Sequence, residues 1–106
     1  MSKWYFVVRA TVVDVARRQA FDAWYAQEHL PQAMAAFGVQ KAWRFWSESD
    51  PAIHQAVYEF IDRAALERAV TSETMKGLVS DFDRAWPGIP RAREIMRLAQ
   101  EAGAGS

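Results

Sequence analysis

The residue type best suited to chemistry in this sequence is the histidine at position 29, in the segment 21–31, FDAWYAQEHLP. Apolar residues recur there at helical spacing, and Pro31 lacks an amide hydrogen, so we expect the helix to break or kink close to His29. A ring at a helix break can turn into the mouth of a cavity, and an imidazole exchanges protons near neutral pH. We therefore predict His29 as a general acid/base. The alternative is a structural histidine that hydrogen-bonds Glu28 or a backbone carbonyl.

Arg9 and Glu59 are the second pair of candidate catalytic residues. Both lie on the partly polar faces of predicted strands that are neighbours in the expected sheet, so their side chains can pair inside a cavity and orient a ligand. A buried ion pair adds little net stability because desolvation offsets the attraction, so such a pair points to a functional role. The alternative is an ion pair that faces solvent or the seam between two subunits.

Aromatic and basic residues supply the candidate substrate-binding set. Its predicted members are Trp24, Tyr25, Trp43, Arg44 and Tyr58. The aromatic rings can stack on a flat ligand, but Trp43 and Trp46 lie on opposite faces of one strand, so at most one of them lines a given cavity. Arg44 shares a face with Trp46 and can steer an anionic substrate, while a surface role for Arg44 is equally open. The alternative for the rings is packing in the core and between subunits.

The elements that must position these side chains alternate between strand and helix periodicity. The predicted strands are 4–13, 39–48 and 53–61, and the predicted helical segments are 15–29, 32–37 and 62–86. Asp14 and Asp62 are candidate caps at helix starts, Gly38 suits a helix end, and Thr71-Ser72 can interrupt the last helical segment. Residues 91–99 fit either a strand or a helix.

The order β-α-β-β-α, with a final strand, is that of the split βαβ, ferredoxin-like sandwich. We therefore predict an α+β fold with an antiparallel sheet and helices on one face, as a single domain over residues 1–99 with a flexible tail over 100–106. The other face of the sheet carries Tyr5, Val7 and Val57 and must be covered. A twofold homodimer covers it by packing two sheets into a dimeric α/β barrel. The aromatic content of 13% supports this packing.

Several residues also match the pattern F-x-x-W/Y-Y-x-x-x-H-x-P, followed by a glycine and then a strand with an arginine or tyrosine. The matching residues are Phe21, Trp24, Tyr25, His29, Pro31, Gly38 and Arg44. In this pattern the chain resembles the EthD-like branch of the dimeric α/β-barrel superfamily, over roughly residues 4–86. The resemblance implies the ferredoxin-like fold, a homodimer, and relatives that include polyketide cyclases, dehydratases, isomerases, small monooxygenases and haem-handling proteins.

Composition narrows the classes of partner and chemistry. Thirteen basic residues balance thirteen acidic ones, so no net charge attracts nucleic acid or an anionic membrane. No apolar run approaches the ~20 residues that span a bilayer, and the first residues do not form a signal peptide, so we expect a cytoplasmic protein. There is no cysteine, and the two histidines, of which His54 is expected at the surface, lack metal-ligand spacing. No glycine-rich phosphate loop occurs, so we expect no cofactor and no metal.

The first functional hypothesis is a small cofactor-independent enzyme that cyclises, dehydrates, isomerises or decarboxylates a hydrophobic cyclic metabolite by proton transfer. His29 is its acid/base, and Arg9, Glu59 and Tyr58 or Tyr25 orient it. The second hypothesis is a non-catalytic dimer that binds a small ligand or has only a structural role. The third is a haem-handling or small monooxygenase-type barrel that uses His29 and a nearby tryptophan.

Overall fold

A single antiparallel sheet of four strands organises the fold in the computed structural model, which describes residues 2–103. The strands are β1 (Trp4–Thr11), β2 (Ala42–Trp46), β3 (Ile53–Phe60) and β4 (Arg91–Arg97). Their order across the sheet is β2-β3-β1-β4, so β1 pairs with both β3 and β4. This order and the β-α-β-β-α-β connectivity confirm the predicted ferredoxin-like α+β fold.

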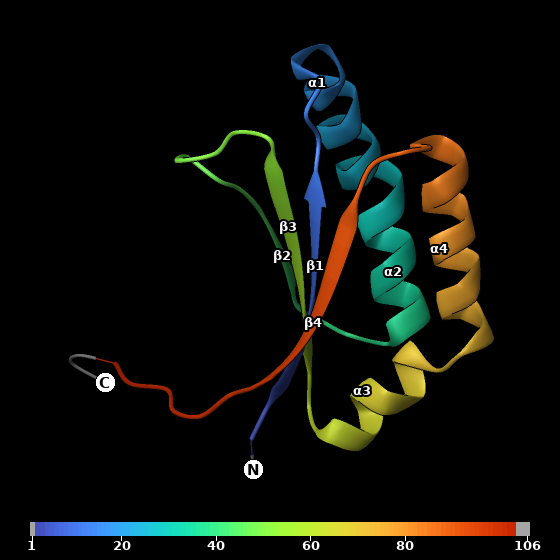
Figure 1. The fold of residues 1–106 in the computed structure, drawn as a ribbon. Helices are drawn as coiled ribbons and strands as arrows, with labels where there is room; N and C mark the ends of the chain where they lie inside the picture. The colour runs from blue at the N-terminus through green and yellow to red at the C-terminus, as the bar shows by residue number, and fades with distance from the viewer. Residues whose placement is uncertain (1, 104–106) are drawn as a thin grey trace.

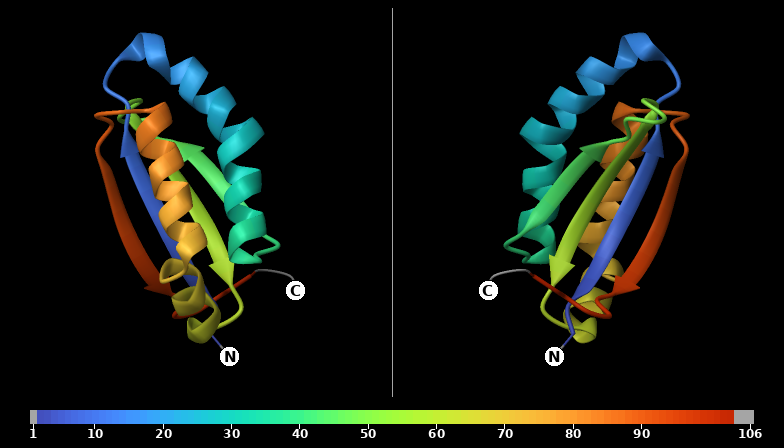
Figure 2. Two further views of the ribbon diagram at one scale, coloured as in Figure 1. Left: turned by 90° about the vertical axis from the view of Figure 1, so that its right-hand side faces the viewer. Right: turned by 90° about the vertical axis from the view of Figure 1, so that its left-hand side faces the viewer.

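Helices cover one face of this sheet and leave the other open (Figures 1 and 2). The helical elements are α1 (Val15–Trp24), η1 (Tyr25–His29), α2 (Leu30–Phe37), α3 (Arg63–Val70) and α4 (Glu73–Ala85). The side chains of Asp14, Asp62 and Ser72 each accept a hydrogen bond from a backbone amide in the first turn that follows. The interruption at positions 71–72 is confirmed, because α3 ends before it and α4 begins after it.

The helix does not break at Pro31, and the irregularity predicted near His29 takes the form of a π-helical turn, a feature that commonly kinks helices. The chain runs from α1 through a π-helical turn, η1, into α2 without a gap. The backbone amide of Leu30 donates to the carbonyl oxygen of Tyr25, five residues earlier. The wider turn places Pro31 in the first turn of α2, where the missing amide hydrogen is tolerated. His29 therefore lies at the end of the π turn within one continuous helical stretch, and it is buried.

Residues 91–97 form β4, so the segment that fitted either a strand or a helix is a strand. β4 lies at the edge of the sheet and pairs with β1. Residues 98–103 have neither helix nor strand, and Figure 1 shows this end of the chain leading away from the helices on the open side of the sheet. Of the predicted tail over 100–106, residues 104–106 lie outside the described part of the chain.

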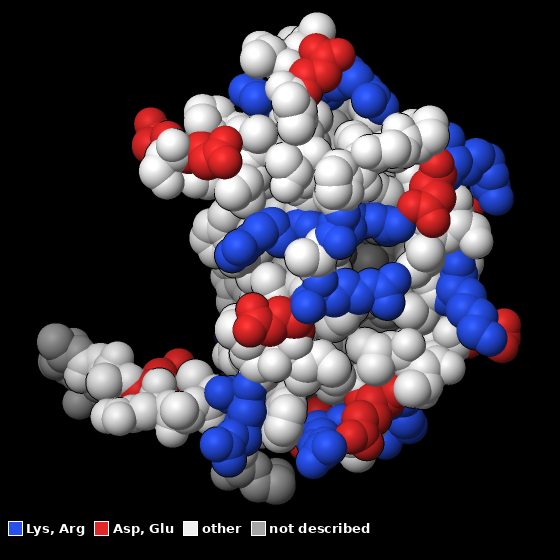
Figure 3. All heavy atoms as spheres, in the orientation of Figure 1, with Lys and Arg blue, Asp and Glu red and all other residues white. Residues whose placement is uncertain are grey.

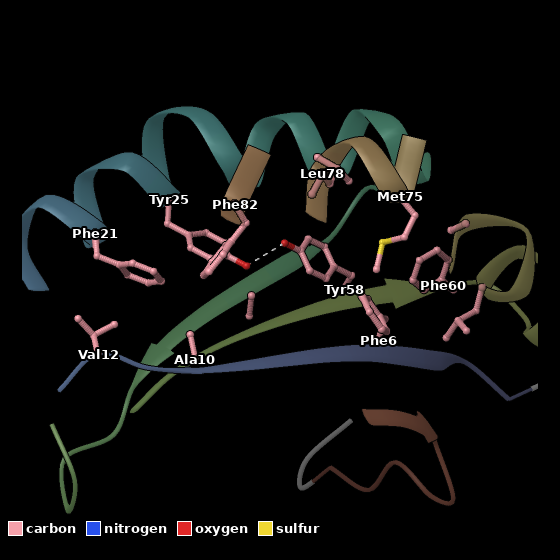
Figure 4. Close-up of a cluster of buried hydrophobic side chains, with 14 residues drawn as sticks. Phe6, Ala10, Val12, Phe21, Tyr25, Tyr58, Phe60, Met75, Leu78 and Phe82 are labelled. Atoms are coloured by element: carbon pink, nitrogen blue, oxygen red, sulfur yellow. Dashed lines mark hydrogen bonds between the residues drawn. The ribbon is translucent and has the colours of Figure 1, made fainter. Parts of the chain in front are cut away.

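The hydrophobic core lies between the sheet and the helices (Figure 4). Its largest fully buried side chains are Tyr25, Tyr58, Phe21, Phe60, Phe82, Leu66, His54 and Val12. The strand period of two explains the contribution of β3, because its even-numbered positions 54, 56, 58 and 60 are all buried on the helix side. Figure 4 shows Tyr25 and Phe82 reaching down from the helices toward the sheet.

The open face of the sheet is apolar for a surface that no helix covers. It carries Tyr5, Val7, Trp43, Phe45 and Val57. Trp43 and Phe45 are 39% and 53% exposed, whereas Val7 is buried even without a partner. Large exposed apolar patches mark interaction surfaces, so this face is the candidate site for a second subunit.

Candidate functional site

A small cavity lies between the sheet and the helices, next to β4. Its polar lining comes from Tyr25, His29, Tyr58, Arg91 and Arg93. Its apolar lining consists of Phe6, Val8, Ala33, Phe37, Met75, Leu78, Val79 and Phe82. The volume is about 30 Å³, which is room for one or two water molecules, so a ring-shaped ligand enters only when lining side chains move. Figure 3 shows basic side chains lying across β4 beside a hollow in the surface.

His29 sits in the wall of this cavity and is only 7% exposed. Its ring stacks on Trp24 at 4.6 Å between centroids and meets the ring of Tyr25 edge-on at 4.9 Å. Its buried Nδ1 has no hydrogen-bond partner within the described residues. Burial, reinforced by the charge of Arg91, lowers the pKa of His29 to about 4. The imidazole is therefore neutral at pH 7 and can accept a proton at one nitrogen while donating from the other.

Tyr25 and Tyr58 face each other beside His29, with their hydroxyl oxygens 3.5 Å apart (Figure 4). Burial raises the pKa of both phenols, so both stay protonated at neutral pH. Each hydroxyl carries one hydrogen. When one tyrosine donates to the other, the second O–H is free to donate to a ligand in the cavity.

Arg44 lies behind Tyr25 and not in the cavity lining that was predicted for it. Its guanidinium donates to Asp22 Oδ1 over 3.0 Å from Nη1 and 2.8 Å from Nη2, and Trp46 Nε1 donates to the same oxygen over 2.8 Å. Arg44 Cζ lies 5.6 Å from the ring centroid of Tyr25, within cation–π range. The hydrogen bonds to Asp22 connect α1 with β2, and the Arg44 guanidinium packs against the Tyr25 ring.

His54 is completely buried, so its expected place at the surface is wrong. Arg44 Nη1 lies 3.4 Å from His54 Nε2, and the His54 ring packs on Tyr25 at 4.6 Å between centroids. The prediction failed because it placed the residue by its position at a strand start, whereas Phe21 of α1 covers that end of β3. Burial lowers the pKa of His54 to about 4.

The predicted pair of Arg9 and Glu59 does not form. Both lie on the open face of the sheet, where Arg9 donates to Gln55 over 3.0 Å and Glu59 accepts from Tyr5 over 3.0 Å. The strand register explains the separation, because Arg9 stands opposite Gln55, four residues along β3 from Glu59. The sheet lies between this pair and His29.

Trp43 also lies on the open face, away from His29, with its ring centroid 6.4 Å from that of Tyr5. The structure therefore brings together His29, Trp24, Tyr25 and Tyr58 from the predicted set and leaves Arg9, Glu59 and Trp43 on the other face. The cavity beside His29 lies between the sheet and the helices, on the opposite side of the sheet from Arg9, Glu59 and Trp43.

Arg91 and Arg93 are cavity residues that the sequence reasoning missed. Arg91 pairs with Asp83, and its guanidinium lies 4.0 Å from the ring centroid of Phe82. The signal was the alternation of arginines along the last strand, which places both on the helix side. Sequence alone does not assign this alternation to a sheet face, because residues 91–99 also fit a helix.

Comparisons with known proteins address the fold. No protein-family profile matches the sequence, and no curated protein matches it. A variant of SnoaB, a cofactor-independent oxygenase from Streptomyces nogalater, has a TM-score of 0.68 at 16% identity, over 95% of this chain and 97% of that chain. An ethyl tert-butyl ether d (EthD) family protein from Bacillus halodurans has a TM-score of 0.62 at 17% identity, over 89% and 97%.

A third match is a dimeric ferredoxin-like protein from an uncultured marine organism. It has a TM-score of 0.68 at 18% identity, over 96% of this chain and all (100%) of that chain. At these identities the likeness concerns the fold alone. It confirms the predicted ferredoxin-like fold and the fold-level resemblance to an EthD family protein.

Within residues 2–103, no helix is both long and apolar enough to cross a membrane. The same residues contain no group of three or more histidine, cysteine, aspartate or glutamate side chains placed to hold a metal ion.

Proposed function

We propose that this protein is a cofactor-independent acid/base enzyme that acts on a hydrophobic cyclic molecule bound beside His29. The observation that carries the proposal is a neutral, buried imidazole whose Nδ1 lacks a partner, in the wall of an otherwise mainly apolar cavity. A buried polar group left unpaired costs about 1–3 kcal/mol. Because no hydrogen bond within residues 2–103 offsets that cost, a ligand that bonds the imidazole offers a reason for a histidine at this position.

The proposed reaction begins with a proton transfer to His29. The substrate loses a proton from an acidic C–H or O–H, and the ring-shaped anion lies against the tyrosine hydroxyls and near Arg91. With a pKa of about 4, free His29 is a weak base, so the transfer depends on the anion forming beside the imidazolium. Return of the proton to a different carbon completes an isomerisation. In a cyclisation the carbanion attacks a second carbonyl carbon of the substrate, and the proton goes to the alkoxide that results. In a dehydration the C–O bond of a neighbouring hydroxyl group breaks, and the proton leaves with that group as water.

An oxygenase is the second candidate, and the fold likeness to the cofactor-independent oxygenase SnoaB over 95% of this chain favours it. The first step is the same proton loss. The resulting carbanion is then oxidised by dioxygen, so that a ring CH₂ becomes C=O and one molecule of water is released. This candidate differs from the first in its consumption of oxygen.

The small volume of the cavity favours a third candidate, a non-catalytic dimer with a filled core. In this case the cavity never opens to a ring. The structural role then rests on the open sheet face, which we propose packs against a second copy of the chain; the likeness to a dimeric ferredoxin-like protein supports a dimer.

One experiment separates these candidates. The purified protein is incubated without oxygen in D₂O with a ring ketone such as 2-tetralone, and the exchange of its acidic C–H for C–D is followed by NMR. We expect the wild type to accelerate exchange and His29→Gln to abolish the acceleration, while Arg9→Gln on the other face does not. Oxygen uptake on admission of air identifies the oxygenase. An equal rate of C–H to C–D exchange with and without the protein would contradict the acid/base proposal.

A further inference from the structure

We propose that Arg93, at the mouth of the His29 cavity, selects substrates in which the apolar ring carries a carboxylate. This inference rests on the proposed function, since it names the substrate class for the same cavity. It concerns the recognition of the substrate and not the proton transfer.

The charge at the mouth of the cavity comes from the helix-facing side of β4. That side carries Arg91, Arg93, Ile95 and Arg97, with no acidic residue among them. Only the first two line the cavity. Their stems and charges border a wall that is otherwise largely apolar and aromatic.

The two arginines of the cavity differ in how their charges are satisfied. Arg91 forms an ion pair with Asp83 and packs on the face of Phe82, and its side chain is 18% exposed. Its charge is therefore largely compensated within the protein. Among the ion pairs of residues 2–103, none involves Arg93. The mouth of the cavity therefore holds one positive charge in excess.

The planar geometry of an arginine side chain suits a carboxylate. The guanidinium offers parallel N–H donors that match the two carboxylate oxygens, and it forms such pairs at the edge of apolar sites. A ligand with its ring against His29 and its carboxylate at the rim keeps the charged group in water-accessible space. The ring alone is then desolvated, which limits the cost of binding.

A structural reading of Arg93 makes a different prediction. β4 is an edge strand, and charged side chains on edge strands prevent pairing with other chains. In that case any of the exposed arginines of β4 serves equally well. Arg97, which lies on the same side of the same strand but does not line the cavity, is the matched control.

The test is isothermal titration calorimetry with 2-naphthoate and with 2-naphthamide, which has nearly the same shape and no charge. We expect the wild type and Arg97→Gln to bind the acid about tenfold or more tightly than the amide, the ratio usual for one hydrogen bond to a charged group. Arg93→Gln should bind both probes within about threefold of each other, and added salt should weaken only the acid. Thermal unfolding checks that both variants fold.

Two outcomes contradict the inference in distinguishable ways. If both probes bind with equal affinity, or if Arg93→Gln keeps the preference for the acid, the carboxylate selection is wrong while the ring-binding cavity stands. If neither probe binds the wild type, and neither binds Met75→Ala, in which the cavity is enlarged, the cavity holds no ring. The proposed function then fails together with the inference.

Discussion

At the scale of single residues, the buried histidines are the most informative feature of this chain. His29 and His54 both stand among aromatic rings, and each has an Nδ1 without a partner within the described residues. A core built only for stability would place an apolar residue of similar size at either position, because an unpaired buried polar group is costly. Only His29 lines the cavity, which is why the proposed chemistry is assigned to it.

Stability should fall when the solution is acidified. Burial lowers the pKa of His29 and of His54 to about 4, below the value of about 6.5 expected in the unfolded chain. Between these two pKa values the unfolded chain binds more protons than the folded chain, so the free energy of unfolding rises with pH. It therefore decreases as the pH drops from about 6.5 to about 4. Each histidine contributes at most about 3 kcal/mol. Urea unfolding between about pH 7 and pH 4 measures the effect.

The control for this pH dependence is His29→Gln, which removes one titrating group. We expect the slope of the free energy of unfolding against pH to drop by about half in the acid window, because one of the two shifted groups is gone. An unchanged slope would mean that His29 is not buried in its neutral form.

Arg44 should matter more for stability than its partly exposed ion pair suggests. Arg44→Ala removes the two N–H groups that donate to Asp22 Oδ1. It also removes the guanidinium that lies beside His54 Nε2 and the Tyr25 ring. We expect a loss of about 1–3 kcal/mol in the free energy of unfolding. Arg9→Ala, on the open face of the same sheet, should stay within about 0.5 kcal/mol. Equal losses in the two variants would contradict the supporting role of Arg44 behind the cavity.

At the scale of the elements, α4 carries one wall of the cavity through Met75, Leu78 and Phe82. Its start depends on Ser72, which accepts from the backbone amide of Met75 over 3.1 Å. Ser72→Ala should therefore lower the free energy of unfolding by about 1 kcal/mol, the usual loss of a helix cap. Thermal unfolding measures it against Ser80→Ala, an exposed position of the same helix, where little change is expected. A loss of the same size at both positions would count against the cap.

The periodicity of the sequence predicted the elements and the fold because each strand has a buried face that repeats every two residues. β3 shows the rule clearly, since every even position from 54 to 60 is buried. The π turn was not predictable in this way. Pro31 signals a local problem for the helix, but whether the chain breaks or widens by one residue depends on the tertiary packing of Tyr25 and His29.

The candidate site was only partly predictable for a related reason. His29, Tyr25 and Tyr58 were identified from one helix pattern and one strand, and the structure brings them together. Sequence spacing does not reveal which side of the sheet leaves an unfilled space. Glu59 is adjacent to Tyr58 yet lies across the sheet from the cavity, because neighbouring strand positions point in opposite directions.

At the scale of the whole molecule, the open sheet face predicts self-association. Trp43→Glu places a charge among the apolar side chains of this face and should convert a dimer to a monomer, because an unpaired charge is costly in an apolar interface. Native mass spectrometry reports the number of chains directly. Val15→Glu is the control, since Val15 is exposed on α1, on the helix side of the sheet. A wild type with the mass of one chain would contradict the dimer.

The proposed function requires that a ring-shaped ligand contacts His29 inside the cavity between the sheet and the helices. The most direct measurement is NMR of ¹⁵N-labelled histidine side chains during titration with 2-naphthoate. We expect the ring nitrogens of His29 to shift strongly as one of them gains a hydrogen-bond partner, while those of His54, which lies outside the cavity lining, change little. Binding that leaves the His29 signals unmoved would place the ligand elsewhere and contradict the proposed function.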